Sequence, residues 1–445
     1  MTNLVVVPAL AASVLFVSLT LLVNSSTVRT AMAAQPEPHD RGEKFTAQVV
    51  GVVWLNPLQR KDYSTEWQLL RTLGLVGPNR DDDLLKKNPD KYSRLQPIAS
   101  IAWGLNGTTS LDEYYKQYLY ELLDKFHDSY FSDATYFYNA HSLKDKTSWR
   151  ELAGIRVELA LPGNGWDAIK AGELTREKIT SIFSIGNKNM PTLWSRSIPP
   201  DVRVTAGGAN AGFGSLASAL NYLKSKPDET VWVMGWDAPG RPLDKQINEN
   251  LVLLVLAGPD CKTERQPLAW IGFPVASAVA AYEAKKGLPA PAVQAWQTVV
   301  EGAAQRSGNK ISDIGYVIHD ANTISPKSSE RLSPLAQTLT FELPGLDFMK
   351  DVFNTPALLG DMGAGTMLTN LALAIGYANH IGKPVLVAGT TELDRPNAVL
   401  VCPPAVVRNI DAEKPWFRAR SEAHAYLPWW GLRHDAKPTT QGYSK

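Results

Sequence analysis

The chain has 445 residues, of which 44% are hydrophobic and 20% are charged, and this composition excludes an intrinsically disordered protein. Its 45 Lys and Arg residues balance 44 Asp and Glu residues, so the net charge of +1 gives no electrostatic basis for binding nucleic acid or an anionic lipid surface. The length is enough for two domains, or for two similar halves that share one large core.

The chain opens with an uncharged apolar run, LVVVPALAASVLFVSLTLLV, at residues 4–23. Such a run is long enough to cross a bilayer, and the small residues at 31–33 are also typical of a signal-peptide cleavage site. The first positive charges, Arg29, Arg41 and Lys44, follow the run, which by the positive-inside rule favours a cytoplasmic body, anchored in the inner membrane if the run is retained. A secretory signal without a basic start, which would make the protein periplasmic, and a start codon set too far upstream are the alternatives. A proline-broken linker completes this segment, residues 1–45.

In the next part of the chain, short β-branched runs alternate with amphipathic stretches. Strands are predicted at residues 49–55, from residue 154, and at 230–235 and 249–260, and helices at 66–76 and 213–224. The spacing of apolar residues between Ser110 and Tyr138 is helical, and this stretch is rich in tyrosine. The charged sequence RDDDLLKKNPDKYSR, residues 80–94, is predicted to be a surface loop.

The following part continues the alternation. PVASAVAAYEAKKG (274–287) and PAVQAWQTVVEGAAQRSG (291–308) are predicted to be small-residue helices, and a strand is predicted to end at His319. The sequence GDMGAG, residues 360–365, is a tight turn that enters an Ala/Leu-rich helix, and residues 382–404 contain two strands joined by a turn. Strands and helices that alternate with short loops predict an α/β fold with a buried sheet.

Signatures of common catalytic and cofactor sites are missing from the sequence. The seven His residues show no zinc-ligand spacing, the glycines of residues 360–365 do not have dinucleotide-binding spacing, and no G-x-S-x-G or Gly-Lys-Ser/Thr motif occurs. The two cysteines, Cys261 and Cys402, lie in or beside apolar runs and are expected to be buried thiols without a disulfide. The sequence therefore predicts no cofactor and no metal.

Residues 411–445 form a tail with an unusual density of aromatic residues. The tail either straps back over the body or provides a strip that binds a partner, because Trp, Tyr and Arg dominate the energetics of protein interfaces. The candidate protein-binding residues, each of which could also serve packing alone, are Trp416, Arg418, Trp429, Trp430, Tyr114, Tyr118 and Tyr136.

Several of these stretches together resemble the thiolase and ketosynthase family, over about residues 46–407. ISDIGYVIHDANTISPKSSERLSPLAQTL resembles the family's strand that ends in its first catalytic histidine, and TPALLGDMGAGTMLTNLALAIGYA resembles the later loop and helix that carry the second. AGGANAGFGSLASALNYLKSKPDETVWVMGW resembles the nucleophile loop, its buried helix and the next strand. The resemblance implies two similar α/β halves, residues 46–245 and 246–410, with buried mixed sheets and helices between and outside them.

Compared position by position, this chain lacks most of the family's catalytic residues. The family's nucleophile is a cysteine at a helix N-terminus, but here that stretch begins at Ala209 and reads Ala-Asn-Ala-Gly. His319 falls on the first histidine, whereas Asp361 occupies the position of the second. An aspartate is an anion at neutral pH and cannot donate a hydrogen bond to an oxyanion. We therefore expect a protein without enzymatic activity, in which Ala209, His319 and Asp361 are vestigial.

Among proteins of this fold, the overall sequence resembles the type VI lipase adaptor proteins of bacteria. This resemblance implies a cytoplasmic adaptor that binds a phospholipase toxin and loads it onto the VgrG spike of a type VI secretion system. Homodimers are common in this fold and stay an option, and membrane contact would involve only residues 4–23, if they are retained. The main alternative is a divergent acyltransferase or condensing enzyme that uses Ser215 with His319, and a third is a periplasmic binding module.

Overall fold

The computed structural model describes residues 43–58, 65–78, 80–95, 101, 110–132, 152–163, 167–187, 196–237, 247–263, 265–322, 326–410 and 429–430. The apolar run at residues 4–23 and three candidate binding residues, Tyr136, Trp416 and Arg418, lie outside these ranges. Within them, no helix is long and apolar enough to cross a membrane.

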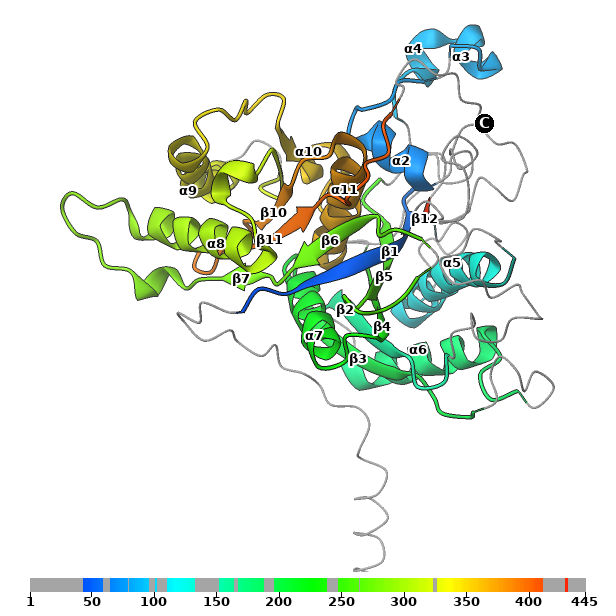
Figure 1. Cartoon of the computed structure of the whole chain (residues 1–445). Coiled ribbons are helices and arrows are strands. Elements are labelled where there is room, and N and C mark those ends of the chain that lie inside the picture. Colours follow the sequence, from blue (N-terminus) through cyan, green and yellow to red (C-terminus); the bar gives the residue numbers. More distant parts are fainter. Residues whose placement is uncertain are drawn as a thin grey trace, which may run out of the picture.

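The secondary structure alternates along the chain (Figure 1). The strands are β1 (Thr46–Leu55), β2 (Arg156–Pro162), β3 (Asp201–Gly207), β4 (Thr230–Asp237), β5 (Asn250–Ala257), β6 (Ala269–Gly272), β7 (Val275–Ala276), β8 (Tyr316–His319), β9 (Val352–Asn354), β10 (Val385–Gly389), β11 (Asn397–Cys402) and β12 (Trp429–Trp430). The α-helices are α2 (Thr65–Thr72), α3 (Asp83–Lys87), α4 (Pro89–Tyr92), α5 (Leu111–Ser132), α6 (Ala168–Ile182), α7 (Ala211–Ser225), α8 (Pro291–Ser307), α9 (Pro326–Glu342), α10 (Thr355–Leu359) and α11 (Thr366–Ile381). Short 3₁₀ turns are η2 (Val279–Ala281), η3 (Ile311–Asp313) and η4 (Gly363–Gly365).

The sheet consists of two halves with the same strand order. In the first half β1 pairs with β5 and β5 with β4, both antiparallel, and then β4 with β2 and β2 with β3, both parallel. In the second half β6 pairs with β11 and β11 with β10, both antiparallel, and then β10 with β8 and β8 with β9, both parallel. The antiparallel pair β1–β6 joins the two halves. The predicted pair of similar α/β halves is therefore present.

The boundary between the halves differs from the predicted one at residue 246. Strand β5 completes the first half, because it lies between β4 and β1 in the sheet. The halves therefore divide between Ala257, where β5 ends, and Ala269, where β6 begins.

Helices form a layer between the two halves and cover both outer faces. Helix α11 contacts β10 and β11 of the second half, β5 and β1 of the first half, and α7. Helices α5 and α6 pack on the outer face of the first half, and α8 and α9 on that of the second. The central helix layer thus belongs to both halves.

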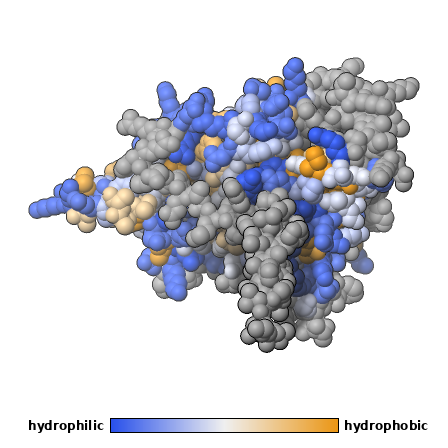
Figure 2. Space-filling model, turned by 90° about the horizontal axis from the view of Figure 1, so that it is seen from below, coloured by the Kyte–Doolittle hydropathy of each residue, from blue (hydrophilic) through white to orange (hydrophobic). Residues whose placement is uncertain are grey.

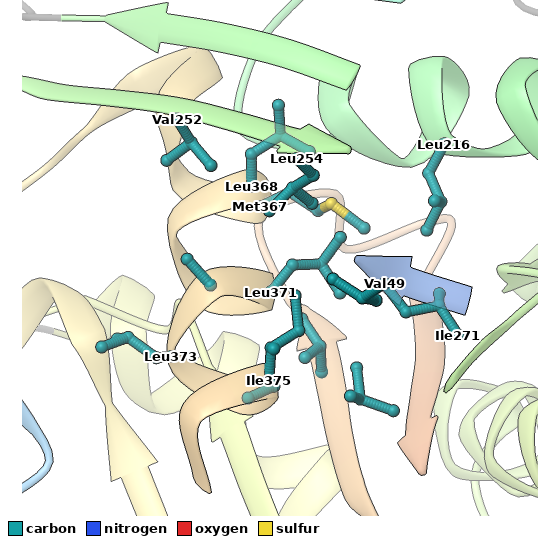
Figure 3. Packing of buried hydrophobic residues seen from close by; sticks show 14 of the residues in the cluster. Val49, Leu216, Val252, Leu254, Ile271, Met367, Leu368, Leu371, Leu373 and Ile375 are labelled. Carbon is teal, nitrogen blue, oxygen red and sulfur yellow. The ribbon is translucent and has the colours of Figure 1, made fainter. Parts of the chain in front are cut away.

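Helix α11 is buried along almost its whole length, and its sequence accounts for this position. Leu, Ala, Met and Ile occur all around it, so it has no polar face to present to water. Figure 3 shows its side chains directed toward strands of both halves and toward α7; the labelled residues are Val49, Leu216, Val252, Leu254, Ile271, Met367, Leu368, Leu371, Leu373 and Ile375. At its entrance, a β-carbon on Gly365 would lie 3.1 Å from the Asp237 backbone nitrogen, so the turn packs closely against the sheet.

Two secondary-structure predictions were wrong. Residues 274–287 were predicted to be a helix, but they form β7, the single turn η2 and an extended arm, because the backbone N–H groups of Ser277 and Val279 donate to Pro396 and Asp394. In Figure 2 this arm projects at the left with a hydrophilic tip. The side chain of Lys285, a residue of the arm, is exposed. Residues 80–94 were predicted to be a surface loop, but they contain the short helices α3 and α4. The segment lies at the surface, as predicted.

Two further features concern the cysteines and the tail. Cys261 and Cys402 are buried and form no disulfide, as predicted. In the tail, the backbone of β12 pairs antiparallel with β1, Trp430 opposite Gly51 and Trp429 opposite Val52. This pairing agrees with the strap interpretation for these two residues.

Candidate functional site

The residues that were predicted to correspond to the catalytic centre of thiolase-like enzymes lie where the central helix α7 begins and strands β8 and β10 end. In the parallel ladder His319 of β8 faces Ala388 of β10 on one side and Asn354 of β9 on the other. A β-carbon placed on Gly389, the next residue of β10, would lie 2.5 Å from Oδ1 of Asn210, the residue that precedes α7. The fold therefore brings the nucleophile loop and the first histidine position to the same edge of the sheet.

His319 is a buried, neutral imidazole. Its side chain belongs to the core, and burial lowers its pKa from 6.5 to about 4. Its Nδ1 accepts a hydrogen bond from the backbone N–H of Ala321 at 3.2 Å, so the proton of the neutral ring is on Nε2. At neutral pH, His319 can thus donate a hydrogen bond through Nε2, but it carries no charge.

Asp320, which was not among the predicted site residues, holds the end of β10 in place. Its Oδ1 accepts hydrogen bonds from the backbone N–H and the hydroxyl of Thr390, and its Oδ2 accepts one from the hydroxyl of Thr391. Burial raises the pKa of this carboxyl above its usual range. Asp320 is therefore a positioning residue, and the adjacent pair His319-Asp320 at a predicted strand end was the only sequence signal that could have revealed it.

Asn210 carries a buried carboxamide at the beginning of α7. Within the described part of the chain, neither Nδ2 nor Oδ1 has a hydrogen-bond partner, and the side chain provides no cap for α7. It packs against Gly389, where only a residue without a side chain fits. Ala209, just before it, is the residue predicted to stand at the nucleophile position, and its methyl side chain is unreactive.

Asp361, the residue at the second histidine position, is exposed and bonds to its own loop. Its Oδ1 accepts from the N–H of Gly363 at 2.9 Å, and its backbone carbonyl accepts from Asn248. Among the hydrogen bonds and ion pairs of the described residues, none links Asp361 to His319. The local carboxylate–backbone bond is one that Asp favours at turns and helix entrances.

The candidate nucleophiles are not beside His319. Cys402 of β11 follows Val401, which pairs with Val385 at the beginning of β10. Val385 in turn faces Tyr316, the first residue of β8. Cys402 therefore lies at the opposite end of β8 from His319. The backbone carbonyl of Cys261 accepts from Gln48, which pairs with Trp270, the partner of Cys402 in β6. Ser215 is completely buried inside α7, and no hydrogen bond of the described residues joins it to His319.

Two of the predicted partner-binding tyrosines are core residues. Tyr114 is 3% exposed and Tyr118 is 2% exposed, and both belong to the outer core of the first half. The hydroxyl of Tyr118 donates to the buried carboxylate of Glu249 at 2.7 Å, and its ring packs on Trp236. Their burial favours packing, the alternative given for these residues, because the helical spacing directs them toward the sheet.

A group of large apolar side chains is exposed on the second half instead. Phe341, in the last turn of α9, is 75% exposed, and Met349, in the connection to β9, is 90% exposed. Phe348 beside Met349 is also exposed. This connection is anchored because Leu343 is buried in the outer core of the second half. We call Phe341, Phe348 and Met349 the α9 surface group.

Comparison with protein families and solved structures agrees with this geometry. Residues 280–403 match the family model described as type VI lipase adapter protein Tla3, C-terminal. This match confirms the predicted resemblance to lipase adaptors for that part of the chain, which is less than half of its length. No curated protein matches the sequence significantly.

The solved structures that resemble the chain are thiolase-like. The AntDE:AntF complex, a type II polyketide synthase acyl-carrier protein with its ketosynthase, has a TM-score of 0.50 at 9% identity and covers 81% of this chain and 100% of its own. The ishigamide ketosynthase/chain length factor has a TM-score of 0.49 at 14% identity, covering 80% of this chain and 99% of its own. 3-Oxoacyl-(acyl carrier protein) synthase III of Pseudomonas aeruginosa PAO1 has a TM-score of 0.42 at 14% identity, and the match covers 82% of this chain and 100% of the synthase chain. At 9% identity the likeness to the AntDE:AntF ketosynthase complex is one of fold, and together with the two halves of the sheet it confirms the predicted thiolase-like fold.

Proposed function

We propose that this protein is a non-catalytic adaptor that binds a lipase and delivers it to the VgrG spike of a type VI secretion system. The observation that carries the proposal is the match of residues 280–403 to the C-terminal region of a type VI lipase adapter. The geometry of the vestigial site supports it, because His319 is accompanied by Ala209 and Asn210 where a condensing enzyme would have its thiol. We further expect the folded body to work in the cytoplasm, where a toxin would be loaded before export.

The α9 surface group is the surface that we assign to the lipase. It lies within the matched residues, and exposed large apolar side chains that are close in the chain are typical of binding sites for other proteins. Truncating such anchors removes apolar contact area without disturbing the core that lies beneath them.

The test is a pull-down from the native bacterium with the full chain as bait. We expect a lipase and a spike component among the retained proteins. Phe341→Ser combined with Met349→Ser should reduce lipase recovery at least tenfold. Ile169→Ser, which changes a 47% exposed residue of the first half, should leave it unchanged. Absence of any lipase from the wild-type sample would refute the adaptor role, whereas equal recovery by all variants would refute only the assigned surface.

A divergent acyltransferase is kept as the second candidate because a neutral His319 lies at the same sheet edge as the beginning of α7. Incubation with acyl thioesters followed by intact-mass measurement distinguishes the two functions. The adaptor proposal predicts no covalent adduct. An adduct that disappears in Ser215→Ala or His319→Ala would establish the enzyme.

A further inference from the structure

The α9 surface group is carried by a segment that is anchored in the core. In the connection from α9 to β9, Leu343 is buried in the outer core of the second half and Leu346 packs against this core, whereas Phe348 and Met349 are exposed. The backbone N–H of Leu346 donates to the carbonyl of Leu343 at 3.0 Å. The exposed side chains therefore stand on a fixed base.

Asp347 closes the turn that presents Phe348 and Met349. Its Oδ1 accepts a hydrogen bond from the backbone N–H of Met349 at 2.9 Å, and its own N–H donates to Oδ2 of Asp351 at 3.1 Å. Its carbonyl accepts from the N–H groups of Lys350 at 3.0 Å and Asp351 at 2.7 Å. Aspartate suits such a turn because its short side chain reaches the backbone N–H two residues further on. Asp347 thus holds the turn through its side chain and through both of its backbone groups.

The turn is also tied to the sheet and is ionised at neutral pH. The carbonyl of Asp351 accepts from the N–H of Val317 in β8 at 2.9 Å. The bond from the Met349 N–H and the ammonium of Lys350, 3.3 Å away, lower the pKa of the Asp347 carboxyl below its usual range. The turn is therefore ordered before any partner binds, and a preordered loop loses less conformational entropy on binding.

The charges of the connection favour a protein partner over a lipid surface. Residues 343–351 contain one basic residue, Lys350, and it is paired with Asp347. Anionic lipid headgroups attract clusters of Lys and Arg and would repel the carboxylates of Asp347 and Asp351. An apolar pocket of a protein needs no basic cluster, because large apolar side chains are themselves the anchors of such interfaces.

We propose that Asp347 is a positioning residue of the α9 surface group, and that its carboxylate holds Phe348 and Met349 in the orientation in which an apolar pocket of the lipase binds them. This inference rests on the proposed adaptor function and explains how its lipase-binding surface is organised. Because Asp347 acts through its two neighbours, its removal should matter only while they are present.

The first test needs no partner. In the full chain, Asp347→Ala should make the amides of Met349, Lys350 and Asp351 exchange with solvent at least tenfold faster, while exchange in β4 and β5 stays the same. Asp347→Asn keeps an oxygen that can accept from the Met349 N–H and should restore wild-type exchange. Equal exchange of the three amides in wild type and Asp347→Ala would overturn the proposal.

The second test measures lipase recovery in the pull-down with the full chain as bait. Asp347→Ala should reduce recovery at least fivefold, and Asp347→Asn should keep it within twofold of wild type. In a Phe348→Ala/Met349→Ala background, adding Asp347→Ala should change the residual recovery by less than twofold, because the side chains that it positions are gone. The control is Asp167→Ala, which removes the same type of bond in the first half, from the Ile169 N–H to Asp167 Oδ1 at 2.9 Å, and should leave recovery unchanged.

The outcomes separate this inference from the proposed function. A wild-type sample without any lipase would refute the adaptor role, whereas equal lipase recovery by wild type and Asp347→Ala would refute only the positioning role. An equal loss from Asp347→Ala with and without Phe348→Ala/Met349→Ala would show that Asp347 does not act through these side chains. Sedimentation of wild type with vesicles of phosphatidylcholine and phosphatidylglycerol, abolished by Phe348→Ala/Met349→Ala, would assign the group to a lipid surface instead of the lipase.

Discussion

At the scale of single residues, a cluster of ionisable side chains on β2 and β3 makes the stability of the fold depend on pH. Arg156 bonds to Glu158 at 2.6 Å and to Asp201 at 2.7 Å, so two carboxyl groups share one buried guanidinium. Glu158 is 1% exposed, and burial raises its pKa from 4.5 to about 7, although Arg156 acts in the opposite direction. Glu158 therefore keeps its proton in the folded protein at pH values where the unfolded chain has lost it.

The sign of the pH effect follows from this raised pKa. The stability contributed by the neutral carboxyl is fully present below pH 4.5 and is lost as the pH rises through about 7. Glu158→Gln removes the titration but keeps an oxygen that accepts from Arg156. Between pH 5 and pH 8, the free energy of unfolding of wild type should fall relative to the variant by up to about 3 kcal/mol. Urea unfolding at several pH values measures this difference, with exposed Glu173→Gln as control, and parallel curves for wild type and Glu158→Gln would contradict the assignment.

The contact between Asn210 and Gly389 gives a second prediction for single residues. Gly389→Ala would place a β-carbon 2.5 Å from Asn210 Oδ1 and 2.6 Å from Phe213 Cε2, so it should cost about 1–3 kcal/mol. Asn210→Ala removes a buried carboxamide that has no described hydrogen-bond partner, so it should be neutral or stabilising.

Thermal unfolding of the two single variants and the double variant measures these effects. In the double variant the new β-carbon at residue 389 no longer meets Asn210 Oδ1 but still meets Phe213. The double variant should therefore be more stable than Gly389→Ala alone and less stable than wild type. Strong destabilisation by Asn210→Ala would show instead that its amide is satisfied, for instance by a bound water or ligand.

At the scale of elements, a buried ionic contact ties α2 and α11 to the segment that follows β11. Glu66 of α2 accepts from Nη1 of Arg408 at 2.7 and 2.9 Å, and its carboxylate lies 2.9 Å from Nε2 of His380. The Nδ1 atom of His380 contacts the carbonyl of Arg408 at 2.6 Å and must carry a proton, because a carbonyl oxygen only accepts. Glu66 therefore fixes the chain from which the tail departs.

Glu66→Ala should be strongly destabilising because it leaves Arg408 and His380 without their carboxylate. Removing one partner of a buried ion pair costs about 3–5 kcal/mol. The loss should appear in urea unfolding and as faster hydrogen exchange at residues 403–410. Glu113→Ala, which breaks an exposed contact to Lys116, should change stability by less than about 1 kcal/mol. Similar effects of the two variants would show that Glu66 does not hold this segment.

The elements that could be predicted from the sequence are those with a strong local pattern. The apolar runs gave β4, β5, β10 and β11, and the Ala/Leu-rich run after Gly365 gave α11. Strand β6, with four residues, and the edge strand β3 were missed because their patterns are short or partly exposed. The run at 274–287 has helix-forming alanines, but contacts with the turn between β10 and β11 hold it extended.

The candidate site could be predicted only where a local sequence pattern marks it. His319 was identified from its strand and motif, whereas Asp320 and the fit of Asn210 against Gly389 depend on contacts between segments far apart in the chain. For Tyr114 and Tyr118 the sequence left packing and partner contact both open, and their burial shows that both rings pack in the core. Trp429 and Trp430 gave no strand signal that distinguishes pairing with β1 from exposure in a tail.

At the scale of the whole molecule, the shared central layer determines how the protein unfolds. The largest hydrophobic cluster combines Val252 and Leu254 of the first half with Ile318 and Val387 of the second, and α11 lies between them. Each half has its own outer cluster, but neither can bury its inner face without the other. We therefore expect residues 43–410 to unfold as one cooperative unit, although two halves of this size often form separate domains.

Calorimetry of the full chain tests this expectation. A single transition whose calorimetric and van't Hoff enthalpies agree is the expected result, and substitutions in either half should shift that same transition. Leu371→Ala, near the centre of α11, should lower the temperature of this transition, because deleting a buried leucine side chain costs about 2–5 kcal/mol of stability. A matched change on an outer face, Leu339→Ala in α9, should lower the midpoint temperature of that same single transition and should not produce a separate one. Two separable transitions, of which only one responds to Leu339→Ala, would mean that the halves are stable alone and that α11 belongs energetically to just one of them.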